Sequence, residues 1–295
     1  MEKIVLNAYA KINPFLEITG KRADGYHEID SLMMSLSLCD TLTLTRSDGG
    51  ISITSDASGV PTDKRNIAYK TARLLLDASA DTRGVHIDIQ KRIPTEAGMG
   101  GGSADGAAVL VGLNKLLGEP FSTDELCAFG AAVGADIPFC VRGGCIRVGG
   151  IGDVVLEHLP VPKLYVLVAK GREGISTPAA YAALDSRCAD FCGYSPKVPA
   201  DILASVKNGD KIGIVGGFYN IFEQALDGLA PSAKALKDRL DAPSQGALLC
   251  GSGTAVFAVF DNEAQAYAAK ALLSKDGHVS FAEVCTTMPY GVEIV

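Results

Sequence analysis

A glycine-rich segment between a predicted strand and a predicted helix constrains this chain more than any other feature. Residues 94–106 read PTEAGMGGGSADG, with four glycines in the five positions 98–102. Residues 85–93 alternate apolar and polar side chains as a strand does, and residues 107–118 have helical spacing and end in Gly118. Glycine lets backbone N–H groups turn toward a ligand, and a helix N-terminus adds partial positive charge. The segment therefore predicts an anion site, and we expect the anion to be a nucleotide phosphate.

The familiar glycine-loop motifs do not fit this segment. Walker A requires G-x-x-x-x-G-K-[ST], and no lysine follows any of these glycines. The dinucleotide fingerprint G-x-G-x-x-G fails at its sixth position, which is Ser103 counted from the first glycine and Asp105 counted from the second. The protein-kinase motifs H-R-D and D-F-G are missing as well. A tight turn without a ligand is the alternative, but a plain turn rarely needs so many glycines.

Length and charge limit the classes of function. A chain of 295 residues with 47% hydrophobic and 21% charged residues is typical of a soluble globular protein of one large or two medium domains. The net charge of −7 and the pI near 5.2 argue against non-specific binding to nucleic acid or to an anionic membrane. Local groups or Mg²⁺ must therefore hold a bound polyphosphate. The sequence leaves the metal ligands and the oligomeric state open.

The lack of a recognisable targeting signal and the scattered cysteines lead us to expect a cytoplasmic protein. The N-terminus has no signal-peptide pattern, and no apolar run approaches the length of a membrane span. The eight cysteines include no C-x-x-C pair, and Cys188 and Cys192 lack a second pair or a nearby histidine that would complete a zinc site. We expect the cysteines to be small buried hydrophobes in a reducing compartment.

The order of predicted elements indicates an α+β fold of two domains. Predicted strands lie within residues 3–54 and at 85–93, 140–150, 153–159, 164–169, 247–260 and 278–287. Predicted helices lie at 64–78, 107–118, 122–134, 218–228, 231–240 and 263–275, and the region 171–200 is predicted as a loop with a short helix. The order lacks the regular β-α-β repetition that would indicate a doubly wound sheet. The prolines of LPVPK (159–163) mark the boundary between an N-terminal domain, 1–160, and a C-terminal domain, 161–295.

Phosphoryl transfer from a bound nucleotide needs a group that orients or deprotonates the acceptor, and cations that offset developing charge. Lys11 lies in a weakly charged predicted strand, and Asn13 follows two residues later on the same face. Asp136 directly follows a predicted helix in GADIPF (134–139). These side chains are candidates for that chemistry. Ordinary turn formation beside Pro138 is the alternative for Asp136.

The glycine segment resembles the phosphate-binding motif of the GHMP small-molecule kinases. Three further segments match the same family in order and spacing: AKINPFLEITGKRADGYHEI (10–29), GADIPFCVRGG (134–144) and GSGTAVFAVF (251–260). The resemblance runs from about residue 7 to 260. It implies an N-terminal domain like the second domain of ribosomal protein S5, a ferredoxin-like C-terminal domain, and a site in the cleft between them. It also implies ATP and Mg²⁺ as cofactors and a small-molecule alcohol as acceptor.

The same resemblance assigns roles residue by residue. Asp136 matches the catalytic aspartate that takes or orients the proton of the acceptor hydroxyl, and Lys11 matches the lysine beside it. The patterns A-K-x-N and R-x-D-G-Y-H match family members whose acceptor carries a cytidine diphosphate group. Residues expected at the substrate are Asn13, Tyr26, His27, Thr177, Tyr181, Gly251 and Ser252. Residues expected at ATP are Asn66, Lys91, Pro94, Glu96, Ala97, Gly98, Met99, Gly100, Gly101, Gly102, Ser103 and Ala104.

The chain departs from the family pattern in the glycine segment. Met99 stands where leucine is usual, and we expect no consequence because both side chains are apolar and unbranched at Cβ. Ala104 replaces a second serine, and the consequence stays open. Asp105 either holds Mg²⁺ or favours the helix N-terminus.

Three other functions were compatible with parts of the sequence. Another GHMP kinase with a different alcohol acceptor would not need the D-G-Y-H block and Tyr181. A nucleic-acid-binding protein on an S5-like domain conflicts with the acidic charge balance. A catalytically inactive nucleotide sensor gains no support, because Lys11 and Asp136 are both present.

Overall fold

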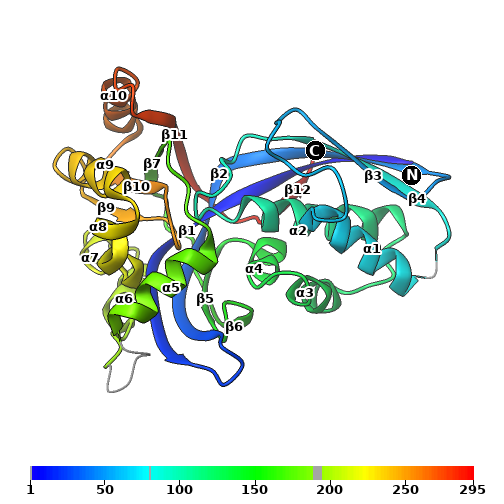
Figure 1. Cartoon of the computed structure of the whole chain (residues 1–295), viewed down its shortest axis with the longest axis horizontal. Helices are drawn as coiled ribbons and strands as arrows, with labels where there is room; N and C mark the ends of the chain where they lie inside the picture. Colours follow the sequence, from blue (N-terminus) through cyan, green and yellow to red (C-terminus); the bar gives the residue numbers. More distant parts are fainter. Residues whose placement is uncertain (1, 80, 189–194) are drawn as a thin grey trace.

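The chain folds into a mixed α/β structure in which helices pack against a large, mainly antiparallel sheet (Figure 1). This computed structural model describes residues 2–79, 81–188 and 195–295. Its strands are β1 (Lys3–Lys21), β2 (His27–Ser47), β3 (Ile51–Ser55), β4 (Gly84–Gln90), β5 (Cys145–Gly149), β6 (Val154–Leu159), β7 (Tyr165–Gly171), β8 (Tyr219–Asn220), β9 (Gly246–Leu249), β10 (Val256–Phe260), β11 (Val279–Met288) and β12 (Val292–Ile294). Its helices are α1 (Ile67–Ser79), α2 (Gly101–Leu116), α3 (Thr123–Ala131), α4 (Ile137–Arg142), α5 (Thr177–Cys188), α6 (Ala200–Asn208), α7 (Lys211–Gly216), the 3-10 helix η2 (Ile221–Ala225), α8 (Leu226–Leu229), α9 (Pro231–Asp241) and α10 (Glu263–Leu273).

The long hairpin of β1 and β2 runs through the molecule and carries part of the candidate site. The two strands pair antiparallel from Lys3 opposite Thr45 to Lys21 opposite His27. The register shifts on either side of the segment that contains Lys11. Such irregularities bend a strand and change the direction of its side chains. The middle of β1 is buried on both faces, so its polar side chains there must find partners inside the protein.

One continuous path of strands connects the two halves of the chain. Its order is β12-β1-β2-β11-β7-β10-β9. β11 makes the connection, because Thr287 and Met288 pair with β2 while the rest of the strand pairs with β7. β12 pairs with Leu6, Asn7 and Ala8 of β1, so the last strand of the chain lies beside the first (Figure 1).

Helices cover the sheet in two groups, each over its own hydrophobic core. α1 to α4 lie together on the N-terminal strands, and α9 and α10 pack on the C-terminal strands (Figure 1). α2 lies against β1 and β2 at the centre of the first group. At Gly112 a Cβ atom would lie 2.7 Å from the side chains of Leu6 and Leu44, so this glycine allows the close approach of helix and sheet.

Several predicted elements are confirmed by the structure. The predicted capping box opens α3: the Ser122 side chain accepts from the Glu125 backbone N–H, and the Glu125 carboxylate accepts from the Ser122 N–H. Five of the six described cysteines are buried and all six are free thiols, whereas the side chain of Cys188 and the whole of Cys192 lie outside the described residues. None of the described helices has the length and apolar character that a membrane span requires.

Two predicted boundaries are wrong. The helix expected at 107–118 begins earlier, at Gly101, because Gly100 adopts a left-handed conformation and the following small residues pack into the first turns of α2. The strand expected at 140–150 is helical in its first part, since α4 covers residues up to Arg142 and β5 begins only after two glycines with positive φ. Pro138 explains the second error, because proline is favoured in the first turn of a helix.

In the C-terminal half, the helix predicted at 218–228 is β8 followed by η2 and α8. The prediction missed α6, α7 and β12.

Candidate active site

A cavity of about 860 Å³ lies where the β1–β2 hairpin, the glycine segment, α5 and the turn after β9 meet. Its volume is within the range of small-molecule and cofactor sites. Both halves of the chain line it. Of the residues expected from the sequence, the structure places these on its wall: Lys11, Asn13, Tyr26, His27, Lys91, Pro94, Glu96, Ala97, Gly98, Met99, Gly100, Gly101, Gly102, Ser103, Asp136, Thr177, Tyr181, Gly251 and Ser252.

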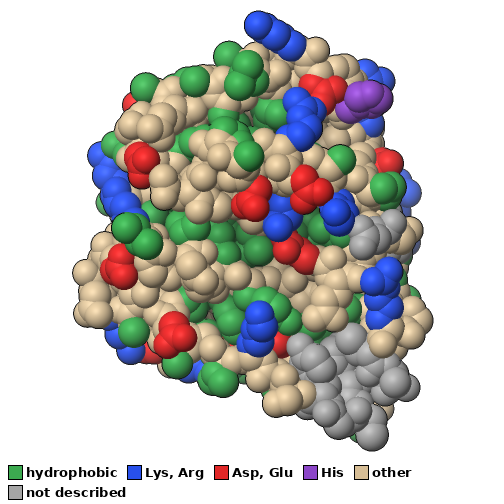
Figure 2. All heavy atoms as spheres, turned by 90° about the vertical axis from the view of Figure 1, so that its left-hand side faces the viewer, with side chains coloured by type: hydrophobic (Ala, Val, Ile, Leu, Met, Phe, Trp, Pro, Cys, Tyr) green, Lys and Arg blue, Asp and Glu red, His purple; other side chains and the backbone are tan. Residues whose placement is uncertain are grey.

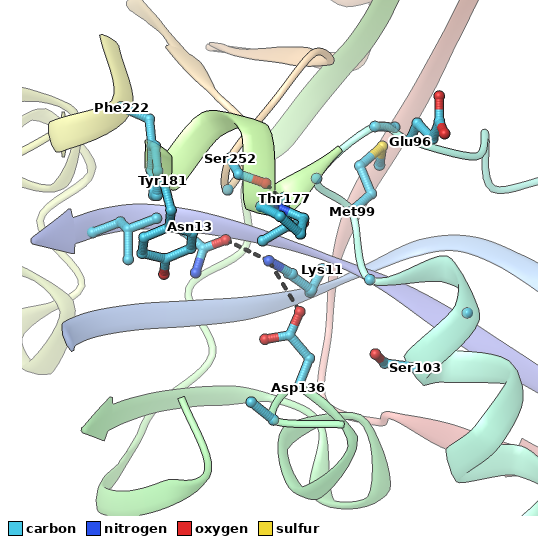
Figure 3. Close-up of a pocket in the computed structure, with 18 of the residues that line it drawn as sticks. Lys11, Asn13, Glu96, Met99, Ser103, Asp136, Thr177, Tyr181, Phe222 and Ser252 are labelled. Atoms are coloured by element: carbon cyan, nitrogen blue, oxygen red, sulfur yellow. Dashed lines mark hydrogen bonds and ion pairs between the residues drawn. The ribbon is translucent and has the colours of Figure 1, made fainter. Parts of the chain in front are cut away.

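Lys11, Asn13 and Asp136 form a connected polar group on the cavity wall (Figure 3). The Lys11 ammonium donates to Asn13 Oδ1 at 2.8 Å and lies 3.6 Å from Asp136 Oδ2. Asn13 Nδ2 donates in turn to Ser31 Oγ at 2.9 Å. The Lys11 side chain is buried, whereas that of Asp136 is 31% exposed. The arrangement presents a carboxylate to the cavity beside a cation that is held in place from behind.

The local fold directs the Asp136 carboxylate toward Lys11. Asp136 is the N-cap residue of α4, a position where an aspartate commonly bonds to the first backbone N–H groups of the helix. Its side chain makes no such capping bond. The carboxylate therefore remains available to the cavity and to Lys11. Ordinary turn formation does not explain an aspartate at this position.

The glycine segment needs glycine because two other segments press against it. Gly98 has φ 73°, and a Cβ atom there would lie 1.9 Å from the Cys250 carbonyl oxygen. Gly100 has φ 70°, and its Cβ atom would lie 3.1 Å from Lys11 Cγ. The Lys11 backbone N–H also donates to the Met99 carbonyl at 3.1 Å. The segment is thus fixed against β1, and α2 begins within it, at Gly101, with its N-terminus at the cavity.

Aromatic rings form the end of the cavity that lies away from the glycine segment (Figure 3). The His27 and Tyr181 rings stack with centroids 4.8 Å apart and an interplanar angle of 28°. The Phe222 and Tyr181 rings lie nearly perpendicular to each other, at 86°, with their centroids 4.8 Å apart. Burial raises the pKa of the Tyr181 phenol, and the charge of Asp136 adds to this effect, so the phenol stays protonated. Tyr26 is 60% exposed and lies at the rim. This end provides flat apolar faces with polar edges, which suits a planar base.

Sequence reasoning missed two residues of this pocket, Asp185 and Phe222. Asp185 Oδ1 lies 2.6 Å from His27 Nε2, and its other oxygen accepts from the Lys21 ammonium at 3.1 Å. Asp185 lies one helical turn after Tyr181 on α5, so the i, i+4 spacing was an available signal. Phe222 carried no comparable signal, because an isolated Phe in an apolar segment indicates only a core residue.

Two residues expected at ATP do not line the cavity. The Asn66 side chain is used locally, since Oδ1 accepts from the Ala68 N–H at 2.9 Å and Nδ2 donates to the Pro61 carbonyl at 2.6 Å. Ala104 is fully buried inside α2. The short polar Asn66 side chain is thus explained by the start of α1, where asparagine is a favoured cap.

Lys91 lies at the cavity, but two buried carboxylates hold its ammonium. Nζ is 2.5 Å from Asp40 Oδ2 and 2.8 Å from Asp105 Oδ2. Burial disfavours the Lys91 charge, but the two carboxylates outweigh burial and raise its pKa. Burial also raises the pKa of Asp105, to about 7, which Lys91 opposes and Asp40 reinforces. Asp105 therefore belongs to a buried ion cluster with one more carboxylate than cations.

The raised pKa of Asp105 predicts that stability falls as the pH rises through about 7. The native state takes up a proton above the ordinary carboxyl pKa, so this stabilisation is present at low pH and is lost above pH 7. Asp105→Asn should remove the dependence and raise the unfolding temperature at pH 8 by at least about 3 °C. Thermal unfolding at pH 5.5 and 8 measures this, with the exposed Asp77→Asn on α1 as control. An unchanged pH slope in Asp105→Asn would contradict the assignment.

The comparisons with known proteins agree with this geometry. A family model described as the GHMP kinases N terminal domain matches residues 66–144. The match contains α1, β4, the glycine segment and α2 to α4, which is the part of the fold that surrounds the glycine segment. It points to the GHMP kinases, and the curated relatives establish this class over most of the chain.

Curated relatives identify the branch of the GHMP kinases to which the chain belongs. The chain is 39% identical over 271 residues to the 4-diphosphocytidyl-2-C-methyl-D-erythritol kinase of Desulfitobacterium hafniense, covering 90% of this chain and 89% of the relative. It is 38% identical to the enzyme of that name from Caldicellulosiruptor saccharolyticus, covering 88% and 89%. The chain therefore belongs to the 4-diphosphocytidyl-2-C-methyl-D-erythritol kinase family of the GHMP kinases.

Solved structures agree with this assignment. A crystal structure of 4-(cytidine 5'-diphospho)-2C-methyl-D-erythritol kinase superposes with a TM-score of 0.80 at 29% identity, covering 96% of this chain and 99% of the other. A homoserine kinase from Cytophaga hutchinsonii superposes with a TM-score of 0.75 at 20% identity, covering 100% and 98%. The second likeness shows the fold alone.

Proposed function

We propose that this chain transfers the γ-phosphoryl group of ATP to the 2-hydroxyl of 4-diphosphocytidyl-2-C-methyl-D-erythritol, giving the 2-phosphate and ADP. The reaction is a step of the methylerythritol phosphate route to isoprenoid precursors. The observation that carries the proposal is the position of the Lys11–Asp136 pair between the glycine segment and the aromatic pocket in one cavity. Identification of the product as a phosphomonoester at the 2-hydroxyl by ³¹P NMR tests the proposal. A phosphate at another hydroxyl would contradict it.

The chemistry proposed is direct in-line transfer. The acceptor oxygen forms a bond to the γ-phosphorus while the bond from that phosphorus to the β,γ-bridging oxygen breaks. Asp136 orients the acceptor hydroxyl and accepts its proton, and Lys11 offsets charge on the hydroxyl oxygen. The 3.6 Å separation of the two charged groups supports these roles. Asn13 holds the Lys11 ammonium in place.

The glycine segment is the proposed phosphate site. Backbone N–H groups at the N-terminus of α2 and the positive end of its dipole would bind the triphosphate. Pro94, the adjoining Glu96–Ser103 segment and Lys91 form this wall of the cavity. Because the Lys91 ammonium already has two carboxylate partners, its proposed contribution is the shape of the wall rather than a free cation.

Magnesium fits this wall as a partner of ATP rather than as a resident metal. Among the residues that the structure describes, no group of three or more His, Cys, Asp or Glu side chains could hold a metal ion. Mg²⁺ commonly binds through one or two protein oxygens and the substrate phosphates. The Ser103 hydroxyl on the cavity wall would contribute one protein oxygen to it. The ion would neutralise the phosphate charges.

The aromatic end is the proposed cytidine site. The Tyr181 face and the polar edge of His27 would hold the cytosine, with Tyr26 closing the rim. Thr177, Gly251 and Ser252 line the wall between this end and Lys11, and Thr177 Oγ1 lies 3.3 Å from Ser252 Oγ. The cavity is continuous from the aromatic rings to Asp136, which supports one acceptor spanning both.

We further propose the domain division and the setting. An S5-like domain of residues 1–160 and a ferredoxin-like domain of residues 161–295 would enclose the cleft. The free cysteines support the cytoplasm as the compartment. Neither nucleic acid nor membrane is proposed as a partner, because the net charge is −7 and acidic and basic side chains are interspersed on the face in Figure 2.

Tyr181→Ala should weaken acceptor binding far more than ATP binding. Loss of a stacking ring commonly costs about 1–3 kcal/mol per base, so the acceptor KM should rise about tenfold or more while the ATP KM changes less than twofold. Steady-state kinetics with each substrate varied in turn measures both. Tyr181→Phe keeps the ring and should stay within about threefold of the wild type. Equal effects on both KM values would count against the cytidine site.

A further inference from the structure

A buried asparagine outside the cavity connects two of its walls. Asn220 is 2% exposed and lies in the short strand β8, which pairs parallel with β1 through Leu16. It follows Tyr219, whose ring packs against Phe15 of β1. Asn220 does not line the cavity, and sequence reasoning assigned it no role.

The side-chain amide of Asn220 bonds to three backbone groups. Nδ2 donates to the Leu249 carbonyl at 3.0 Å and to the Gly251 carbonyl at 2.8 Å. Oδ1 accepts from the Phe222 N–H at 3.0 Å. Only one orientation of the amide satisfies two acceptors and one donor, so the surrounding bonds determine it. A side chain with no N–H donor cannot reproduce this set.

The bond from Asn220 Nδ2 to the Gly251 carbonyl holds the turn after β9, which lies beside Lys11 and Asn13. Gly251 has φ 50°, and a Cβ atom there would lie 2.8 Å from the Gly98 carbonyl oxygen and 3.1 Å from Lys11 Nζ. Its Cβ atom would also lie 3.5 Å from Asn13 Oδ1. A shift of the turn would therefore displace the glycine segment and Lys11 together.

The bond from the Phe222 N–H to Asn220 Oδ1 holds the aromatic end of the cavity. Asn220 is the N-cap of η2, and its bond to the Phe222 N–H fixes the first turn of that helix. The Phe222 ring packs nearly perpendicular to the Tyr181 ring. One buried amide thus sets the spacing between the aromatic pocket and the turn beside Lys11.

We propose that Asn220 is a positioning residue that holds the two ends of the acceptor site in register. This inference rests on the proposed function, because it assumes one acceptor that contacts the aromatic pocket and Asp136 at once. A misplacement of about 1 Å at a reacting group can cost about a hundredfold in rate. Asn220 therefore acts on turnover through the turn and η2, without touching the substrate.

The test is Asn220→Asp at pH 8, which places a carboxylate against two carbonyl oxygens while keeping the side-chain shape. We expect kcat/KM for the cytidyl acceptor to fall at least about thirtyfold, because the reacting geometry is lost. The dissociation constant for ATP, measured by titration without acceptor, should change less than threefold. Lowering the pH to 6 should restore part of the activity relative to wild type, because a protonated carboxyl can donate to one carbonyl.

Asn114→Asp is the matched control. Asn114 is also buried and also bridges backbone groups, donating to the Phe121 carbonyl and accepting from its N–H. It lies near the other end of α2, about 20 Å along the helix from Gly101. Its kcat/KM should stay within threefold of wild type. A fall equal to that of Asn220→Asp, after both are shown to be folded, would overturn the inference.

Two further measurements apply if Asn220→Asp does not fold or if the enzyme uses a different acceptor. They are the kinetics of Asn220→Ser and its amide hydrogen exchange. Serine can donate to only one of the two carbonyls, so an intermediate loss of kcat/KM is expected, and a rate within threefold of wild type would overturn the inference. Exchange in the peptides of residues 219–226 and 246–256 needs no substrate and should become faster in Asn220→Ser. Unchanged exchange would also overturn it. Absence of turnover in the wild type with the cytidyl acceptor would reject the proposed function instead.

Discussion

Asp136→Asn should lower kcat by about 10²- to 10⁴-fold, the range expected for loss of a general acid–base group. The amide has nearly the same shape as the carboxylate but cannot take the proton of the acceptor hydroxyl, and it no longer attracts the Lys11 ammonium 3.6 Å away. ATP affinity should change less than threefold, because the glycine segment is untouched. Single-turnover rates and a direct ATP titration measure the two quantities separately.

Asp124→Asn is the control for this variant. Asp124 pairs with Arg142 at the far end of α4 and is exposed, so its loss affects the same helix without reaching the cavity. It should keep kcat within about twofold of wild type. A near-normal rate in Asp136→Asn would remove Asp136 from the mechanism.

Lys11→Met should produce the second large effect, a loss of at least about a hundredfold in kcat. Methionine fills a similar buried volume but removes the cation that lies between Asn13, Asp136 and the glycine segment. Charge that develops during transfer then lacks its nearest stabilising group.

Lys115→Met on the exposed face of α2 is the matched control and should be near wild type. Rapid-quench kinetics at saturating substrates distinguishes a chemical defect from weak binding. If Lys11→Met raised only the KM for the acceptor, the proposed electrostatic role would be wrong.

Local sequence patterns predicted the parts of the site that depend on local structure. Four glycines between a strand and a helix predicted an anion site at the glycine segment. The structure places this segment on the cavity wall, and positive φ at Gly98 and Gly100 shows that glycine is needed there. The short spacing of Lys11 and Asn13 predicted that they share a face, and the two side chains are hydrogen-bonded. The capping box at Ser122 placed the start of α3 correctly. In each case the sequence pattern that carried the prediction spans only a few residues.

Residues whose role depends on distant partners could not be predicted in this way. The Lys91 side chain pairs with Asp40, 51 positions away in the chain, and no local pattern indicates that pair. Asn220 is bonded to carbonyl groups 29 and 31 positions away. The start of α2 at Gly101 was missed because glycine has a low helix propensity, which tertiary packing overrides here. The roles of Asp136 and Tyr181 came from family resemblance rather than from the residues alone.

The most direct test is ADP release by the purified protein with Mg²⁺-ATP and 4-diphosphocytidyl-2-C-methyl-D-erythritol, compared with mevalonate, homoserine and galactose. The account predicts turnover with the cytidyl acceptor and none above background with the other three. Turnover with another acceptor would keep the kinase class and reject the cytidine site. Binding of ATP without turnover on any acceptor would contradict the central claim and favour a catalytically inactive nucleotide sensor.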